Sequence, residues 1–325
     1  MDTPLFDIDP QANYHAATGL SVCEEILVVP DDAKNIDMSK EPSGITRLAS
    51  GTALNITNIL RNTFGFSVKL LAAVDHVEKG IGRGFISRRM DQMNIDWHPL
   101  PILDGSHTAV IVRRDGAMHK IFSDKRPLLK EMVQEVGNQI RLSNPAVIIA
   151  SGVMPGEVNM IREMFTTKPR AIRVLNPRVQ LIRDTDKFQQ LLENTDLLIL
   201  NHEELGHCLG KEITCEGISL DDIKPIHDRG VSTIILTCNL QGAIVSHPAG
   251  GIWHHQPVVA AKQVVDPTGA GDSFTAGVAA AILHQKPYSE LMLWGAVMSS
   301  INVGKWGGAN CPTLDEFTET VNHNR

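Results

Sequence analysis

Apolar and polar residues alternate along the chain in a pattern that is typical of a parallel sheet covered by helices. Short apolar runs, each expected to be a buried strand, recur in the second half at 146–150, 171–175, 197–200 and 231–237. Helical stretches are expected between and after them, at 156–166, 183–193, 203–209 and 219–229. Apolar strands separated by helices predict a mainly parallel sheet with helices on both faces. Ligands of such sheets bind beyond the carboxyl ends of the strands, so the segments that follow the strands are candidate sites.

The first half of the chain adds a second group of strands. One strand is predicted from Gly19 to Pro30, and a buried strand from Val68 to Val74. Alternating residues from Thr108 to Phe122, interrupted by Asp115-Gly116, predict a hairpin. An isolated hairpin is only marginally stable. We therefore expect it to join the segment 25–47 in a small second sheet.

One stretch late in the chain places small residues where a strand gives way to a helix. Asp266-Pro267-Thr268-Gly269-Ala270-Gly271-Asp272 follows the apolar Val264-Val265 and precedes an uncharged run that predicts a buried helix. Backbone N–H groups are unpaired at a helix start and the helix dipole is positive there, so this turn predicts an anion site, most often for phosphate. Asp272 would then stand beside a phosphate, where a carboxylate can take the proton of an attacking hydroxyl.

The alternative is a purely structural turn. Glycine-rich turns often precede helices, and an aspartate at a helix start is a common cap. On spacing alone, this alternative is favoured over a catalytic site. No Gly-Lys-Ser or Gly-Lys-Thr follows the turn, which excludes a P-loop, and the glycine spacing differs from the dinucleotide fingerprint of oxidoreductases.

Composition narrows the class of protein. The 325 residues are 42% hydrophobic and 21% charged, which is ordinary for a globular chain, and the net charge of −7 argues against a nucleic-acid partner. No apolar run is as long as a membrane span, and the polar, acidic N-terminal stretch is unlike a signal peptide. Five scattered cysteines without a Cys-x-x-Cys pair predict a reducing compartment and no disulfide framework. We therefore expect a cytoplasmic protein.

The stretch from Asp266 to Asp272 resembles the signature Asp-Thr-x-Gly-Ala-Gly-Asp of the ribokinase family of carbohydrate kinases, also called the PfkB family. Only Pro267 departs from the signature, at a position where threonine is usual. The resemblance implies that Asp272 is the catalytic base. It also implies that the amides of this turn form the anion hole, which gives Gly269, Ala270, Gly271 and Asp272.

Further segments are similar to the family's motifs in the same order, over residues 17 to 315. Glu24 stands where the family has an aspartate that binds substrate hydroxyls, and it reaches one methylene further. The turn from Ser50 to Asn55 is similar to the family's Gly-Gly-x-x-x-Asn sugar-binding turn, with serine in place of the first glycine. From the residues alone, Glu24 is equally well a surface acid and Asn55 a solvent-facing helix residue. The resemblance implies substrate contacts from Glu24, Gly51, Thr52 and Asn55.

Two motifs point to the nucleotide. Asn201-His202-Glu203-Glu204 is a helix capping box, and it also stands where the family has the Asn-x-x-Glu motif that organises magnesium and phosphate through water. Both interpretations hold together, because a cap can present its carboxylate to hydrated Mg²⁺. The segment from Thr237 to Ala243 is similar to the family's Thr-x-Gly-x-x-Gly-Ala turn beside the nucleotide, and the alternative is a plain hairpin turn. Asn239 replaces its first glycine, which is acceptable because asparagine adopts left-handed conformations.

The last motif concerns a cation. Ser299 to Ala309 resembles the family's last helix and Gly-Ala loop, which in many members holds a monovalent cation together with the segment around Asp266. The resemblance therefore implies cofactor-binding roles for Asn201, Glu204, Thr237, Asn239, Gly242 and Asn302, with Glu204 binding Mg²⁺ through water and Asp266 a K⁺ ion.

As a whole, the resemblance implies an α/β fold, a ribokinase-like three-layer sandwich with a mainly parallel central sheet and a small β-sheet lid. The core is expected at 15–24, 48–98 and 125–325 and the lid at 25–47 and 99–124. The expected protein is a homodimer paired through the lid, without nucleic-acid or membrane partners. Its expected activity is phosphorylation of a hydroxyl of a small sugar or sugar acid by ATP with Mg²⁺.

Two alternatives remain at this point. The first is a nucleoside (adenosine-like) kinase of the same family, which the low aromatic content of 5% disfavours because a base would need stacking partners. The second is a non-catalytic sugar- or nucleotide-responsive binding protein on the same fold, which the departures at Glu24, Ser50 and Asn239 suggest and the presence of Asp272 disfavours.

Overall fold

A computed structural model of the chain describes residues 6–20, 23–28, 45–75, 81–102, 108–114, 117–122, 130–247, 252–305, 307–308 and 310–325. Within these residues the main sheet has nine strands in the order β13-β12-β11-β10-β9-β8-β1-β4-β5. From β11 to β5 every neighbouring pair is parallel, whereas β12 and β13 run antiparallel at the other edge. The strands are β1 (Tyr14–Leu20), β4 (Val68–Asp75), β5 (Asp96–Ile102), β8 (Pro145–Val153), β9 (Ile172–Pro177), β10 (Leu197–Asn201), β11 (Thr233–Thr237), β12 (Ala243–His247) and β13 (Ile252–Gln256).

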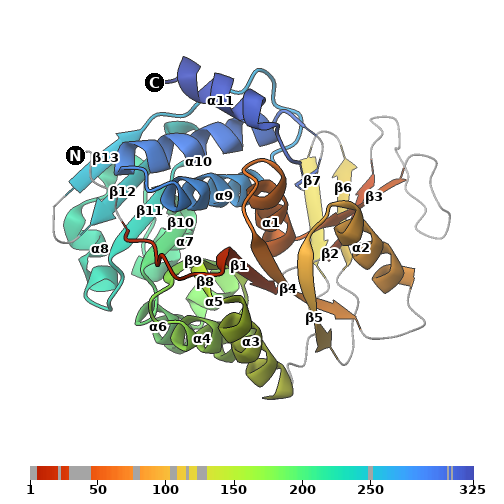
Figure 1. The fold of residues 1–325 in the computed structure, drawn as a ribbon. Helices are drawn as coiled ribbons and strands as arrows, with labels where there is room; N and C mark the ends of the chain where they lie inside the picture. The colour runs from red at the N-terminus through yellow and green to blue at the C-terminus, as the bar shows by residue number, and fades with distance from the viewer. Residues whose placement is uncertain are drawn as a thin grey trace.

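Helices cover both faces of this sheet (Figure 1). One face carries α1 (Thr52–Asn62), α9 (Ala270–Leu283), α10 (Tyr288–Asn302) and α11 (Leu314–His323). The other carries α3 (Lys130–Ser143), α4 (Val158–Thr167), α5 (Val179–Arg183), α6 (Thr185–Leu192), α7 (His202–Leu209) and α8 (Leu220–His227). Short 3₁₀ turns lie at Pro155–Glu157, Cys215–Gly217 and Asn239–Gln241. The three-layer α/β sandwich predicted from the sequence is confirmed.

The pattern of β8 shows why the sequence gives three layers. Successive side chains of a strand point to opposite faces, and all nine residues of β8 are buried. Val147 and Ile149 pack in the core below α1, α9 and α10, whereas Ile148 and Ala150 pack in the core formed with α3 to α8. A strand that is apolar at every position therefore needs a helical layer on each side.

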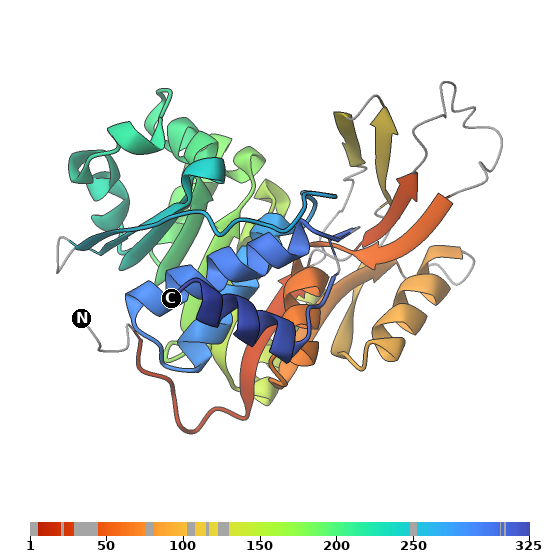
Figure 2. The same cartoon turned by 90° about the horizontal axis from the view of Figure 1, so that it is seen from above.

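Four further strands form a second sheet, called the lid sheet below, in the order β3-β2-β6-β7. Its strands are β2 (Cys23–Val28), β3 (Ile45–Ser50), β6 (Thr108–Arg114) and β7 (Ala117–Phe122). Figure 2 shows it to one side of the sandwich. The predicted hairpin is present as the antiparallel pair β6–β7. The helix α2 (Ile81–Gln92) contributes to a smaller core cluster with α1 and β4.

The predicted single strand from Gly19 to Pro30 is wrong, because the structure has two strands in this segment. β1 ends at Leu20 in the main sheet, and β2 begins at Cys23 in the lid sheet. Gly19 lies inside β1, beside Leu71 and Ala150 of its neighbours, rather than at a strand start. Residues 21 and 22, between the two strands, lie outside the described part of the chain.

The predicted division into core and lid corresponds to the two sheets, but some of its boundaries differ from those of the strands. Residues 23–24 belong to β2 of the lid sheet, and residues 99–102 belong to β5 of the main sheet. The lid residues 29–44 lie outside the described part of the chain. The helices in the described segments include none that is long and apolar enough to cross a membrane.

The helices α9 and α10 approach each other more closely than side chains would allow. A Cβ atom on Gly277 of α9 would lie 2.5 Å from the carbonyl oxygen of Trp294, and one on Gly295 of α10 would lie 2.9 Å from the ring of Phe274. Gly277 therefore lets the backbones of the two helices meet, and Gly295 makes room for the Phe274 ring.

We expect Gly277→Ala to destabilise the protein by about 1–3 kcal/mol, because a methyl group placed against backbone atoms overpacks the contact. Urea unfolding monitored by circular dichroism measures the change. Gly137→Ala in α3 is the matched control, since its Cβ would meet only the flexible side chain of Glu163, which can move away. Equal losses in the two variants would contradict the backbone contact as the cause.

Candidate active site

The start of α9 has the geometry of an anion-binding turn. Gly269 is the N-cap with φ of 78°, a left-handed conformation, and a Cβ there would lie 2.6 Å from the Cα of Gly308. Only glycine meets both conditions. Gly271 is exposed, and apart from its chain neighbours and the backbone of its own helix no atom lies within 4 Å of the place where a Cβ would stand. The turn therefore reaches the surface at Gly271 while Gly269 holds it against the loop at Gly308.

The amides of this turn differ in their hydrogen bonds. The Ser273 amide donates to the Gly269 carbonyl (2.8 Å), which is the first helical bond. The Ala270 amide donates to Pro267 at 3.2 Å, a long bond within the turn. The Gly271 amide has no hydrogen-bond partner in the described part of the chain. The Gly271 amide, on the exposed residue of the turn, is therefore available to donate a hydrogen bond to an anion.

Asp272 and Asn55 meet across the two predicted halves of the site. The half-buried carboxylate of Asp272 accepts a hydrogen bond from the Asn55 side-chain amide at 2.7 Å. Asn55 is 3% exposed, so its amide does not face solvent. Its side-chain oxygen accepts a hydrogen bond from the Ser50 hydroxyl at 3.2 Å. The end of β3, the first turn of α1 and the start of α9 are therefore linked by Ser50, Asn55 and Asp272.

Ser50 is the residue of this site that the sequence analysis did not predict to contribute. It is a departure from the family's Gly-Gly pair, and this departure was the available signal. Its side chain is buried beside Asn55. Because its hydroxyl donates to the oxygen of the Asn55 amide, it directs the NH₂ group of that amide toward Asp272.

The remaining predicted substrate residues have different surroundings. Gly51 is the N-cap of α1 with φ of 111°. The Thr52 hydroxyl donates to the Ser151 carbonyl at 2.8 Å, so it holds α1 against the carboxyl end of β8. The side chain of Glu24 lies outside those that the structure describes, although its backbone belongs to β2.

Asp266 and Asn302 are buried beneath the turn that leads into α9, and both form hydrogen bonds with its backbone. Asp266 is 1% exposed, and its two carboxylate oxygens accept from the amides of Thr268 (2.9 Å) and Gly307 (3.0 Å). The Asn302 side chain donates to the Thr268 carbonyl at 2.8 Å and is also 1% exposed. Its side-chain oxygen is buried without a hydrogen-bond partner in the described residues. A buried acceptor without a partner is costly, and oxygen donors of this kind suit hard cations.

Asn201 and Glu204 form the predicted capping box at the start of α7. The Glu204 amide donates to the Asn201 side chain at 2.8 Å, and the Glu204 carboxylate accepts from the Asn201 amide at 2.9 Å. Burial raises the pKa of Glu204 to about 7, and the nearby Glu203 adds to the rise, while the Asn201 amide and Arg178 oppose it. The described residues hold no cluster of three or more His, Cys, Asp or Glu side chains that would bind a metal by themselves.

The turn after β11 lies next to this capping box. Thr237, at the end of β11, is the register partner of Asn201 at the end of β10. Asn239 has φ of 50°, the left-handed conformation expected of it. Gly242 has φ of 89°, and a Cβ there would lie 2.0 Å from the Gln256 carbonyl oxygen, so glycine is required. The turn exposes Leu240, which is 87% accessible to solvent.

The cysteine pattern predicted no disulfide, but Cys238 in this turn is disulfide-bonded, whereas Cys208 and Cys311 are free. A disulfide joins residues that are close in the fold, which the spacing of cysteines along the chain does not reveal. The partner of Cys238 lies outside the described side chains.

The structure thus brings the predicted residues together in three groups at the carboxyl ends of the parallel strands, where ligands of such sheets bind. One group is Asn55 with Asp272, the second is Asp266 with Asn302, and the third is the Asn201–Glu204 box with the Thr237–Gly242 turn. Their roles with substrate and nucleotide stay predictions.

Comparisons with known proteins agree with this geometry. The chain matches the model of the pfkB family carbohydrate kinases over residues 20–315. It is 30% identical over 152 residues to a ribokinase of Haemophilus influenzae, an alignment that covers 46% of this chain and 47% of that ribokinase, so the chain spans about half the length of this curated relative.

Among solved structures, the fold is similar to a nucleoside kinase of Burkholderia thailandensis in complex with inosine, with 20% identity, a TM-score of 0.74 and coverage of 95% of this chain and 98% of that one. It is also similar to an Arabidopsis thaliana ribokinase complexed with ribose and ATP, with 18% identity, a TM-score of 0.72 and the same coverage. With the family model matching most of its length, the chain belongs to the pfkB family of carbohydrate kinases.

Proposed function

We propose that this protein is an ATP-dependent kinase that phosphorylates a hydroxyl group of a small sugar or sugar acid. The observation that carries the proposal is the hydrogen bond from Asn55 to Asp272 beside the exposed residue Gly271. It places an acid at the junction between the turn expected to bind the sugar and the turn expected to bind phosphate.

In this mechanism Asp272 accepts the proton of the attacking hydroxyl, while the amide of Gly271 and its neighbours bind the oxygens of the transferred phosphoryl group. Positioning and charge stabilisation supply most of the rate in such transfers. Asn55 keeps the Asp272 carboxylate directed to the hydroxyl, since its amide occupies one of the two carboxylate oxygens. Mg²⁺, when bound with ATP, neutralises charge on the phosphates.

The nucleotide is proposed to lie over the ends of β10 and β11. The ribokinase of similar fold binds ATP. In this chain the turn from Thr237 to Gly242 adjoins the capping box, and its exposed Leu240 offers an apolar surface for the base. Glu204 would face Mg²⁺ through water. The cation would stabilise the ionised form of the Glu204 carboxyl group, whose pKa is otherwise raised by burial.

A monovalent cation such as K⁺ is proposed beside Asp266 and Asn302. The unpartnered side-chain oxygen of Asn302 supports this, because it is a buried acceptor next to the turn that a cation would brace. A homodimer paired through the lid sheet and a cytoplasmic location stay predictions.

The second candidate is a nucleoside kinase, which the similar fold of the inosine-bound nucleoside kinase supports. An ADP-release screen over pentoses, hexoses, sugar acids, sugar phosphates and nucleosides separates the two. Turnover with a sugar or sugar acid supports the first proposal, and turnover with nucleosides alone supports the second. Calorimetric binding of ligands without any ADP release would instead support a non-catalytic binding protein.

Replacing Asp272 by Asn should lower kcat by about 10²–10⁴-fold, the contribution typical of a general base, and leave ATP affinity nearly unchanged. Coupled ADP-release kinetics and calorimetry measure the two effects. Asp186→Asn is the matched control, since Asp186 is an exposed acid in the first turn of α6. Turnover retained in Asp272→Asn would remove this residue from the mechanism.

Ser50→Ala should lower kcat about tenfold, which corresponds to the ~1.4 kcal/mol of one lost hydrogen bond, and leave the KM for ATP unchanged. Without the Ser50 hydroxyl, the buried Asn55 side-chain oxygen loses its hydrogen-bond donor, and one bond instead of two holds the amide in its orientation toward Asp272. Ser143→Ala is the control, because Ser143 is equally buried and its hydroxyl donates to the Gln139 carbonyl at 2.7 Å, away from the site. Identical kinetics in the two variants would show that Ser50 has no positioning role.

Glu204→Gln should remove part of the pH dependence of stability. The folded-state pKa of Glu204 is about 7 against an ordinary 4.5, so its favourable contribution is complete below pH 4.5 and is lost as pH rises through 7. The free energy of unfolding of the variant, taken relative to that of wild type at the same pH, should therefore rise by up to about 3 kcal/mol from pH 5 to pH 8. Urea unfolding at both pH values measures it. Glu203→Gln, which alters an exposed neighbour, should keep most of the dependence; a Glu204→Gln variant that behaves like wild type at both values would contradict the raised pKa.

A further inference from the structure

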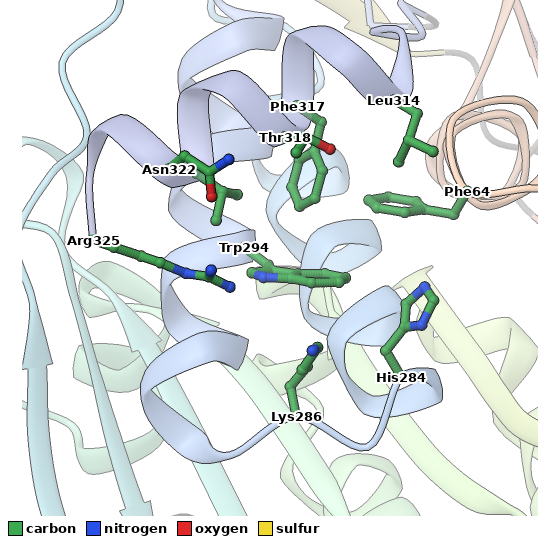
Figure 3. Close-up of a pocket in the computed structure, with 10 residues that line it drawn as sticks. Phe64, His284, Lys286, Trp294, Leu314, Phe317, Thr318, Asn322 and Arg325 are labelled. Carbon is green, nitrogen blue, oxygen red and sulfur yellow. The ribbon is translucent and has the colours of Figure 1, made fainter.

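A cavity of about 300 Å³ lies at the other end of α9 from Asp272 (Figure 3). Residues from the end of α1, the α9–α10 connection, α10 and α11 surround it, chiefly Phe64, His284, Lys286, Trp294, Phe317 and Arg325. Because α9 has 14 residues, its two ends are about 20 Å apart at 1.5 Å per residue. The cavity is therefore separate from the proposed active site.

Three aromatic rings form one wall of this cavity. Phe64 stacks on Trp294 with ring centroids 5.8 Å apart and planes inclined by 6°. Phe317 meets both rings edge-on, at 4.9 Å from Phe64 and 5.0 Å from Trp294. The Trp294 indole N–H donates to Glu290 at 3.0 Å, which fixes the ring. The wall is thus formed before any ligand arrives, and binding would not have to order it.

Arg325, Glu290 and Lys286 together give the surroundings of these rings a net positive charge. Arg325 binds the Glu290 carboxylate through two hydrogen bonds, of 3.1 and 2.8 Å, so these two charges offset each other. The Lys286 ammonium lies 5.8 Å from the centroid of the Trp294 ring and forms no ion pair with any described residue. Figure 3 shows Lys286 and His284 on the same side of Trp294.

His284 adds a second polar group to this side. Its ring lies 5.4 Å from that of Trp294, and its nitrogens have no hydrogen-bond partner within the described segments. Burial lowers the pKa of His284, and the charge of Lys286 lowers it further. An anion in the cavity would reverse the effect of Lys286 and would accept hydrogen bonds from both side chains.

We propose that this cavity binds a small planar aromatic carboxylate, with its ring against Trp294 and Phe317 and its carboxylate beside Lys286. The volume is at the lower limit of ligand pockets, which favours one or two rings and excludes a whole nucleotide. Aromatic walls favour a flat ring, and an ammonium without an ion pair favours an anion.

The packing of α9 and α10 connects this cavity to the proposed active site. The carbonyl of Trp294 lies against Gly277, and the next residue, Gly295, lies against the ring of Phe274, two residues from Asp272. A ligand seated against Trp294 therefore acts on a residue whose backbone is in direct contact with α9, the helix that begins at the proposed active site. On the basis of the proposed function, the carboxylate acts as a regulator, and by linkage its binding and that of MgATP change each other's affinity by the same factor.

The test uses the full-length chain and 2-naphthoate as the probe, with isothermal titration calorimetry. The neutral 2-naphthamide tests the need for charge, and cyclohexanecarboxylate tests the need for an aromatic ring. We expect 2-naphthoate to bind at least tenfold more tightly than either compound, and Lys286→Gln to lose at least tenfold in affinity. Lys224→Gln is the control, since Lys224 lies on α8, on the opposite face of the sheet, and should bind as wild type does. Equal binding by Lys286→Gln, or no binding at millimolar concentration, would overturn the proposal.

The regulatory part is tested by the affinity for MgATP, which needs no known sugar. Saturating 2-naphthoate should change the Kd for MgATP at least threefold in wild type and in Lys224→Gln, and leave it unchanged in Lys286→Gln. Binding of 2-naphthoate without this change would overturn the regulatory role and keep the site. Failure to bind MgATP at all would count against the proposed kinase, whereas the titration with 2-naphthoate would still decide whether the cavity is a binding site.

Discussion

The hydrogen bond between Asn55 and Asp272 is the contact on which the proposed active site depends. It joins residues 217 positions apart in the sequence, and each comes from a different helix start. The position of Asp272 is set by α9. The left-handed Gly269 begins this helix, and Gly277 lets the middle of the helix pack against the backbone of α10. Asn55 owes its place to α1, which Thr52 ties to the end of β8. The site is therefore as well defined as these two helices are.

Much of the fold could be predicted from the sequence because its strands are buried on both faces. An apolar run such as 145–153 has one stable environment, the middle of a parallel sheet, and its length separates it from the helices around it. Two local features could also be predicted, because they depend on residues close in the sequence. Asparagine readily adopts the left-handed conformation found at Asn239, and the Asn201–Glu204 capping box needs only residues three positions apart.

The parts that the sequence did not show depend on tertiary contacts. The change from β1 in the main sheet to β2 in the lid sheet is set by pairing with different strands, which the apolar pattern from Gly19 to Pro30 does not mark. β5 contains Pro99 and Pro101, which argue against a strand. Among the described strands β5 pairs with β4 alone, at the edge of the sheet, where a missing N–H is tolerated. The link from Ser50 to Asn55 required knowing how the end of β3 meets α1.

The position of Ser50 has a consequence for the timing of the reaction. Ser50 ends β3, a strand of the lid sheet, and its hydroxyl also orients the amide that steers Asp272. The same short segment therefore belongs both to the cover over the expected sugar and to the support of the acid. In the proposed kinase, a shift of the lid sheet on sugar binding would reach Asp272 through Ser50 and Asn55, so that sugar occupancy and the position of the acid would be coupled.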